Sequence, residues 1–253
     1  MFPIRDENPT LKPPLATYVI IGLNVFVWAY VQGFGGTEAL AQSLCQYALI
    51  PGDLLNTAVS GTQFPVGGGW VCQITGDGKA TSLLSSMFMH GGWFHLLGNM
   101  LFLWVFGDNV EDVMGPLRFI VFYVLCGLAA AFAQIITDPS SVVPMVGASG
   151  AIGGVMGAYA ILFPRARVHL LIILFVYVTT ISVPAIFMLG YWFLLQLLAG
   201  IGTLGTRGGG VAFWAHIGGF IAGISLIFSF KRPDLIKARS QLTQRSNARH
   251  KWL

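Results

Sequence analysis

Two residues whose side chains can perform nucleophilic chemistry lie in glycine-rich segments of apolar stretches. Ser149 lies in Gly147–Gly150 (GASG) and His216 in Ala215–Gly219 (AHIGG). A serine hydroxyl is a weak nucleophile until an adjacent base takes its proton, and a histidine can be that base. Because an intramembrane ionisable group is costly without a partner, we expect His216 to pair with Ser149. The acidic residues lie in loops or at helix ends, so the sequence predicts a dyad.

Two further polar residues are spaced to act together with this pair. His95 and Asn99 are separated by four positions, so both side chains project from one face of a helix. There they can donate hydrogen bonds to a developing oxyanion, and the backbone N–H of Ser149, near a helix start, is a further donor. We expect Gly147 and Gly150 to support the serine, and His90 to shape the adjoining loop by hydrogen bonding.

Other hydrolytic chemistries do not fit the same residues. His90 and His95 are five positions apart, about 140° around a helix, and neither a His-Glu-x-x-His segment nor an intramembrane carboxylate completes a zinc site. The chain also lacks paired intramembrane aspartates for an aspartyl mechanism. The sequence therefore implies no metal and no other cofactor.

The composition requires a membrane environment for these residues. The chain of 253 residues is 55% hydrophobic and only 9% charged, with a mean hydropathy of +0.72. That leaves too little polar surface for a soluble globule. A hydrocarbon layer needs roughly 20 helical residues. We predict an all-α polytopic membrane protein, a bundle of six transmembrane helices over 16–33, 91–107, 117–136, 147–163, 182–201 and 212–230.

A seventh apolar run, Val168–Ile181, is shorter, rich in β-branched residues and followed by Pro184. We interpret it as an interfacial segment or a lead-in to the fifth span. A separate crossing would move the C-terminus to the other side of the membrane. The charge distribution opposes that arrangement.

Basic residues predict the orientation. With six spans and a cytoplasmic N-terminus, only Lys79 and Arg207 fall outside, and twelve fall inside. These twelve are Arg5, Lys12, Arg118, Arg165, Arg167, Lys231, Arg232, Lys237, Arg239, Arg245, Arg249 and Lys251. We expect a cytoplasmic segment over 1–15, a transmembrane domain over 16–230 and a basic cytoplasmic tail over 231–253. We interpret the tail as a topology anchor at an anionic leaflet, not as a nucleic-acid site.

This topology brings the polar residues to one depth. The second, fourth and sixth spans would all run from outside to inside, so their first residues share the outer side. At 1.5 Å per residue, His95, Asn99, Ser149 and His216 lie roughly 3–13 Å from the outer helix ends. Cys45 and Cys72 fall in the first outer loop, where a disulfide and two free thiols are both compatible with the sequence.

Three ordered segments resemble the motifs of the rhomboid family. They are His90–Met100 (HGGWFHLLGNM), Gly147–Gly150 and Ala215–Gly219. Glu111 and the following segment Met114–Phe119 also resemble the family's connection between the second and third spans. The resemblance covers about residues 82–230, and three motifs on three predicted helices are far more specific than Gly-x-Ser-Gly alone.

The resemblance implies an intramembrane serine endopeptidase that cleaves single-pass or other transmembrane proteins in or beside their membrane segments. Ser149 would be the nucleophile, His216 the base, and His95 and Asn99 the oxyanion donors. Substrates with small or helix-breaking residues near the outer boundary would be favoured. The compact six-span form resembles bacterial members, which implies a bacterial plasma membrane, with the active site open to the outer side.

Two positions depart from the pattern of bacterial-type members. Thr81-Ser82 stands where such members often carry Trp-Arg, which puts the outer-loop architecture in question. Gly153 stands where they carry an aromatic residue that packs beneath the histidine ring. Gly153 and Gly157, with Gly219 and Gly223, form small-x-x-x-small patterns that let two helices approach closely.

Two readings compete with the protease. A non-catalytic relative would bind transmembrane helices for quality control or trafficking, but such proteins normally lack the dyad. A small transporter would show an inverted repeat or helices broken at the midplane, and neither is clear in this sequence.

Overall fold

Most of the chain is helical, and the computed structural model describes residues 2–174, 176–204 and 211–250. The helices are α1 Leu15–Tyr30, α2 Thr37–Tyr47, α3 Pro51–Leu54, α4 Ser82–Ser85, α5 Trp93–Met114, α6 Pro116–Thr137, α7 Ser149–Leu162, α8 Ala185–Thr203, α9 Phe213–Phe230 and α10 Pro233–His250. The strands are β1 Phe2–Asp6, β2 Gln63–Gly67, β3 Trp70–Gln73, β4 Arg167–Leu174 and β5 Tyr177–Pro184. Arg207 and Lys251, both used in the orientation argument, lie outside the described residues.

A helix forms in each of the six ranges predicted to span the membrane. Among the described helices, α6, α8 and α9 are long and apolar enough to cross a bilayer, whereas α1 and α7 are shorter apolar helices. The 22 residues of α5 end in an acidic segment that contains Asp108, Glu111 and Asp112. The chain is a multi-pass integral membrane protein.

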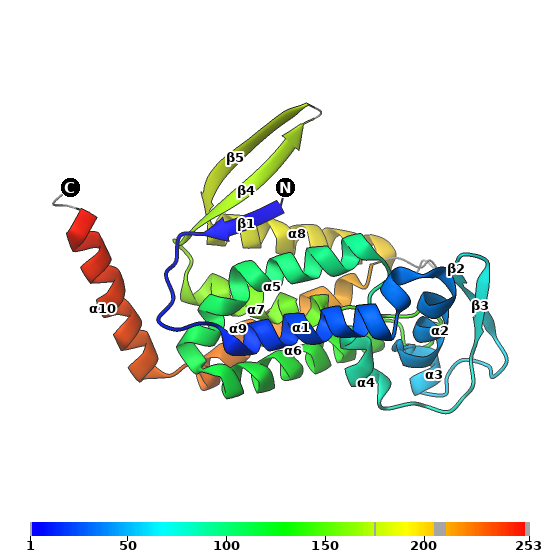
Figure 1. Ribbon diagram of the computed structural model, residues 1–253. Helices are drawn as coiled ribbons and strands as arrows, with labels where there is room; N and C mark the ends of the chain where they lie inside the picture. The colour runs from blue at the N-terminus through cyan, green and yellow to red at the C-terminus, as the bar shows by residue number, and fades with distance from the viewer. Residues whose placement is uncertain (1, 175, 205–210, 251–253) are drawn as a thin grey trace.

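Helix α7 lies at the centre of the bundle and contacts α5, α6, α8 and α9 (Figure 1). Its residues from Gly150 to Ala160 are all buried. A Cβ atom on Gly219 or Gly223 of α9 would overlap the backbone of Gly150 or Gly154 of α7. This contact confirms that small residues bring α7 and α9 together. It involves Gly150 and Gly154 of α7 in addition to Gly153 and Gly157, which also face the backbone of α9.

The fold contains strands, which an all-α prediction omits. The run Val168–Ile181, interpreted as an interfacial segment or a lead-in to the fifth span, belongs to the antiparallel hairpin β4–β5, which ends where α8 begins. Strand β1 pairs with β4, giving the sheet order β1-β4-β5. β-branched residues such as Val168, Val178 and Ile181 suit this extended pairing, which satisfies the backbone groups outside the helices.

Residues 31–92 between α1 and α5, predicted as the first outer loop and here called the outer-loop region, form a small substructure at one end of the bundle (Figure 1). Strands β2 and β3 pair in it, and a disulfide joins Cys45 of α2 to Cys72 of β3, with 5.4 Å between their Cα atoms. Ile50, Phe64, Cys72 and Ile74 form its buried apolar cluster. The structure thus selects the disulfide over two free thiols.

At the opposite end, polar side chains fix the start of α1 and the tail to α5. Glu111 accepts hydrogen bonds from the backbone N–H groups of Ala16 and Thr17, at 2.9 and 2.8 Å, and from the Thr17 hydroxyl at 2.8 Å. The first N–H groups of a helix lack partners within that helix. A carboxylate from α5 therefore caps the N-terminus of α1, where negative charge is favourable.

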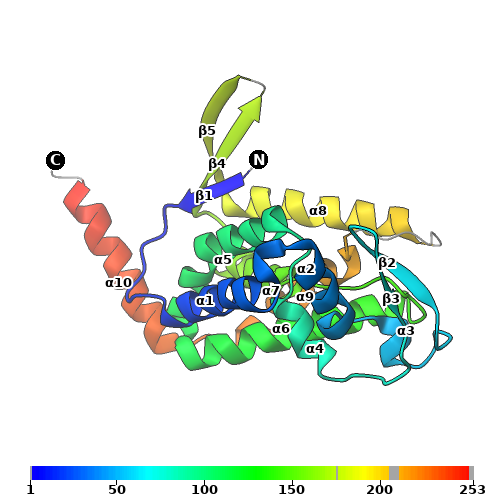
Figure 2. The same ribbon diagram turned by 45° about the vertical axis from the view of Figure 1, so that its right-hand side comes forward.

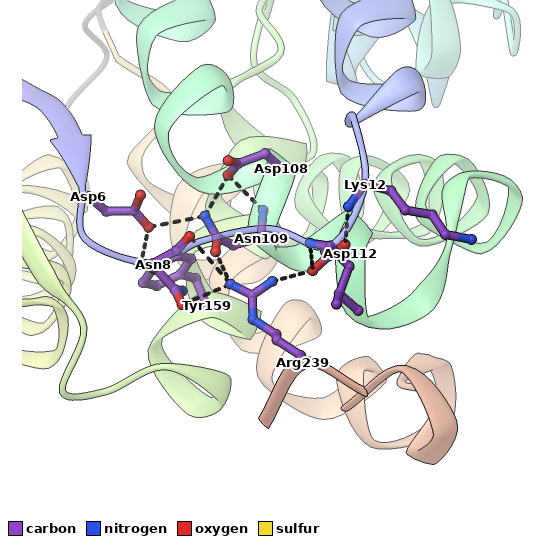
Figure 3. Close-up of polar contacts among 9 residues, drawn as sticks. Asp6, Asn8, Lys12, Asp108, Asn109, Asp112, Tyr159 and Arg239 are labelled. Atoms are coloured by element: carbon purple, nitrogen blue, oxygen red, sulfur yellow. Dashed lines mark hydrogen bonds and ion pairs between the residues drawn. The ribbon is translucent and has the colours of Figure 1, made fainter. Parts of the chain in front are cut away.

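One basic residue of the tail differs from the expected leaflet anchor. Arg239 of α10 is buried, and its guanidinium donates to Asp112 at 2.6 Å and to the Asn8 side chain at 2.8 Å. A further short hydrogen bond joins it to Asn109 (Figure 3). A residue expected to face lipid headgroups instead joins α10, α5 and the N-terminal segment.

Candidate active site

Ser149 is the first residue of the central helix α7, and the backbone before it is shaped to present it. Gly147 has a φ of +123°, a conformation that residues with a side chain rarely adopt. A Cβ atom at Gly147 would lie 2.7 Å from Nε2 of His95. The Gly147 N–H donates to the Ser86 carbonyl at 2.9 Å, which fixes this turn. The glycine therefore lets the serine segment approach His95.

His216 lies in the first turn of α9, directly beside the start of α7. Its Nε2 atom is 2.8 Å from Oγ of Ser149, within hydrogen-bonding distance. The close packing of the two helices sets this distance, because a Cβ atom on Gly219 of α9 would overlap the carbonyl oxygen of Gly150 on α7. The structure thus brings the two predicted residues together across 67 positions of sequence.

The position of Gly153 accounts for the missing aromatic residue on α7. A Cβ atom there would lie 3.0 Å from the carbonyl oxygen of His216 and 3.5 Å from the backbone nitrogen of Phe220. An aromatic ring contacts the imidazole from another helix instead, because the Trp192 ring of α8 lies 5.8 Å from the His216 ring, tilted by 37°. The ring contact is retained, but α8 supplies it.

Sequence reasoning missed a second residue of α8. Oε1 of Gln196 lies 2.7 Å from Nδ1 of His216, the ring nitrogen that does not face Ser149. Trp192 and Gln196 are one helical turn apart, so both lie on the face of α8 toward α9. Figures 1 and 2 show α8 along one side of the bundle beside α9. The sequence feature that could have identified this residue is the polar amide of Gln196 within the apolar range 182–201.

Of the donors predicted on α5, His95 lies against the serine segment and Asn99 lines the same cavity. Nδ1 of His95 accepts a hydrogen bond from the Gly91 N–H at 3.2 Å, so the proton of a neutral ring lies on Nε2, beside Gly147. Asn99 is buried, and its Nδ2 has no hydrogen-bond partner among the described residues. A buried donor without a partner is costly unless a ligand accepts from it.

His90, in the loop before α5, is fully buried and supports His95 from behind. Its backbone N–H donates to Oε1 of Gln32, and its carbonyl accepts from Nε2 of the same amide, both at 2.8 Å. The His90 ring stands edge-on to the His95 ring with centroids 5.1 Å apart. Burial, reinforced by His95, lowers the pKa of His90 to about 3, so the ring is neutral. These hydrogen bonds are made by the His90 backbone, whereas neither ring nitrogen has a hydrogen-bond partner among the described residues.

A cavity of about 1340 Å³ connects these groups. Its lining includes Ser149, His216, His95, Asn99 and Trp192 together with residues of the outer-loop region. The cavity is large enough for a segment of extended peptide. Ser149, His216, His95 and Asn99 thus surround one space. The outer-loop region that completes its lining lies at one end of the bundle (Figure 2).

A rhomboid domain profile matches residues 77–233, a range that contains Ser149, His216, His95, Asn99 and Gln196. The chain is 27% identical to the mitochondrial Rhomboid protein 1 of Saccharomyces cerevisiae over 218 residues, 84% of this chain and 52% of that protein. It is 33% identical to the Rhomboid protease GluP of Bacillus subtilis over 152 residues, 59% of this chain and 27% of that protein.

A third relative, RHOMBOID-like protein 5 of Arabidopsis thaliana, is 37% identical over 82 residues, 32% of this chain and 26% of that protein. The chain thus spans about half the length, or less, of these relatives. The profile match covers well over half of the chain. The chain belongs to the rhomboid family.

Proposed function

We propose that this rhomboid-family protein is an intramembrane serine endopeptidase that hydrolyses peptide bonds in or next to transmembrane segments. The observation that carries the proposal is the 2.8 Å contact between Oγ of Ser149 and Nε2 of His216, which borders a large cavity. A serine next to an imidazole nitrogen is the arrangement that activates a hydroxyl for attack on a carbonyl.

The proposal includes a topology of six crossings by α1, α5, α6, α7, α8 and α9. Both termini would lie in the cytoplasm, and the site would open to the outer side of a bacterial plasma membrane. The disulfide supports this orientation, because such bonds persist in oxidising compartments and this one lies at the end with the cavity. The basic residues of the tail suit the cytoplasmic side. Residues 16–230 would form the protease domain.

The mechanism begins when a substrate segment unwinds beside Ser149 and exposes its scissile carbonyl. The Ser149 oxygen attacks the carbonyl carbon while its proton passes to Nε2 of His216. The negatively charged oxygen then accepts hydrogen bonds from Nε2–H of His95, the Nδ2 amide group of Asn99 and the Ser149 backbone N–H. His216 then gives the proton to the leaving amine, and water hydrolyses the acyl-enzyme.

Substrate choice follows from the need for an extended peptide. Amides inside an intact helix are hydrogen-bonded within the helix and shielded by its side chains. Segments with small or helix-breaking residues near the outer membrane boundary unwind at lower cost. We therefore propose single-pass membrane proteins with such boundaries as the preferred substrates.

The proposal is tested with purified protein in mild detergent, incubated with a fluorescently tagged single-pass membrane protein. The Ser149→Ala variant is assayed beside it, and gel electrophoresis measures cleavage. Cleavage by the wild type alone supports a serine protease whose nucleophile is Ser149. Equal cleavage by both proteins contradicts the proposal.

A negative result has a defined meaning as well. A fluorophosphonate probe forms a covalent bond with an activated serine and reports nucleophilicity without any protein substrate. Absence of both labelling and cleavage in liposomes, with folded protein, would favour a non-catalytic relative that binds transmembrane helices. Labelling of the wild type but not of Ser149→Ala would keep the protease and turn the search to other substrates.

A further inference from the structure

We infer that Gln196 is a positioning residue, which holds His216 in the tautomer and ring orientation required to take the proton of Ser149. This inference rests on the proposed protease function and extends the expected dyad by a neutral third member. The two contacts on opposite edges of one imidazole carry it. Nε2 of His216 lies 2.8 Å from Oγ of Ser149, and Nδ1 lies 2.7 Å from Oε1 of Gln196.

The tautomer follows from what each atom can do. The amide oxygen of Gln196 has lone pairs and no hydrogen, so the bond to Nδ1 requires the hydrogen on Nδ1. A neutral imidazole with its hydrogen on Nδ1 has a free lone pair on Nε2, which faces the Ser149 hydroxyl. The opposite tautomer would present an N–H group to Ser149 and would be unable to accept its proton.

The same oxygen stabilises His216 after proton transfer. When Nε2 takes the Ser149 proton, the ring becomes an imidazolium, and Nδ1–H becomes a stronger donor to Oε1 of Gln196. The amide of Gln196 stabilises the imidazolium less than a carboxylate would. However, an amide carries no net charge, and burying a carboxylate at membrane depth is costly.

The imidazole ring is held from its face as well as from its edge. The Trp192 ring lies 5.8 Å from that of His216, and it also contacts Phe220 of α9 at 6.0 Å. Because Trp192 and Gln196 are one turn apart on α8, a single helix orients both the ring plane and the Nδ1 edge. α8 therefore sets the geometry of a base that belongs to α9.

The test compares two substitutions of Gln196 in the full-length protein. Gln196→Leu keeps much of the side-chain volume and removes the acceptor, whereas Gln196→Glu keeps an acceptor oxygen. We expect Gln196→Leu to lower kcat about tenfold or more with little change in KM, as loss of one hydrogen bond predicts. Gln196→Glu should retain most of kcat and move the acidic limb of the rate–pH profile to higher pH, because an ionised carboxylate favours the imidazolium.

A structural role alone would give a different pattern. It predicts a lower melting temperature for both variants and an unshifted pH profile. Leu195→Ala, at the neighbouring, 43% exposed position of α8, controls for general effects on this helix and should keep wild-type rates. The rate of fluorophosphonate labelling, measured against pH, gives the same readout without a protein substrate.

The outcomes separate this inference from the proposed function. Full cleavage by Ser149→Ala overturns the protease itself. Loss of cleavage in Ser149→Ala combined with wild-type kcat in folded Gln196→Leu overturns only the role of Gln196. Equal loss of kcat in folded Gln196→Leu and Gln196→Glu also overturns it, because the retained acceptor would then be without effect.

Discussion

At the scale of single residues, the site is defined by which hydrogen-bonding atoms have partners and which lack them. Oγ of Ser149 and both ring nitrogens of His216 are paired. The side-chain donor of Asn99 is buried without a partner among the described residues, and Nε2 of His95 borders the serine segment. This contrast suits the proposed mechanism, in which charge develops only in the transition state, since donors fixed in advance then need no reorganisation.

The unpartnered donor leads to a prediction for Asn99. Replacement by Ala should lower kcat roughly 100- to 1000-fold with a small change in KM, because the lost hydrogen bond forms only in the transition state. The kinetics of cleavage measured over a range of substrate concentrations check this. The His95→Gln variant, which keeps an N–H donor, should lose less activity than His95→Ala. A large rise in KM with unchanged kcat for Asn99→Ala would instead place Asn99 in ground-state binding.

At the scale of elements, glycine contacts between α7 and α9 set the distance between Ser149 and His216. Gly219 and Gly223 lie against the backbone of Gly150 and Gly154. Any side chain at these points would drive the helices apart. An aromatic residue on α7 is likewise excluded at Gly153, so the ring contact with His216 comes from Trp192 of α8.

The space around Gly153 yields a quantitative expectation. A Cβ atom added at Gly153 would lie 3.0 Å from the carbonyl oxygen of His216, a backbone atom that moves less easily than the end of a side chain. Gly153→Ala should therefore shift α9 by a few tenths of an ångström and lower kcat/KM, by less than the roughly 100-fold that a misplacement of 1 Å costs. Cleavage assays on folded protein measure this. Gly190→Ala is the matched control, because a Cβ atom there meets nothing within 4 Å. Unchanged kcat/KM in Gly153→Ala would show that the α7–α9 contact tolerates movement.

At the scale of the whole molecule, a disulfide at one end of the apolar bundle and a network of hydrogen bonds at the other end stabilise the structure. The disulfide between Cys45 and Cys72 closes the outer-loop region beside the cavity. The network around Arg239 joins the tail, α5 and the N-terminal segment at the other end (Figure 3). Through Arg239, the tail therefore packs against the rest of the folded protein.

Removing one member of the buried pair should be costly. Arg239→Leu leaves the Asp112 carboxylate buried without its cation, and we expect a loss of about 3–5 kcal/mol in the free energy of unfolding. Thermal unfolding in detergent measures the effect as a lower melting temperature. Lys237→Leu, at an exposed basic position of the same helix, should change it little. Melting temperatures that fall equally in both variants would contradict a specific role for the network.

Composition, apolar run length and motif spacing are local properties, so the membrane class, the helical ranges, the family and the candidate set Ser149, His216, His95 and Asn99 could be predicted from the amino-acid sequence. Six crossings and the roles of these residues stay predictions. The hairpin β4–β5, the disulfide, the burial of Arg239 and the contact between Gln196 and His216 are visible only in the folded chain. Each of these pairs residues from separate elements, and such partners depend on how the helices pack, which no local pattern encodes.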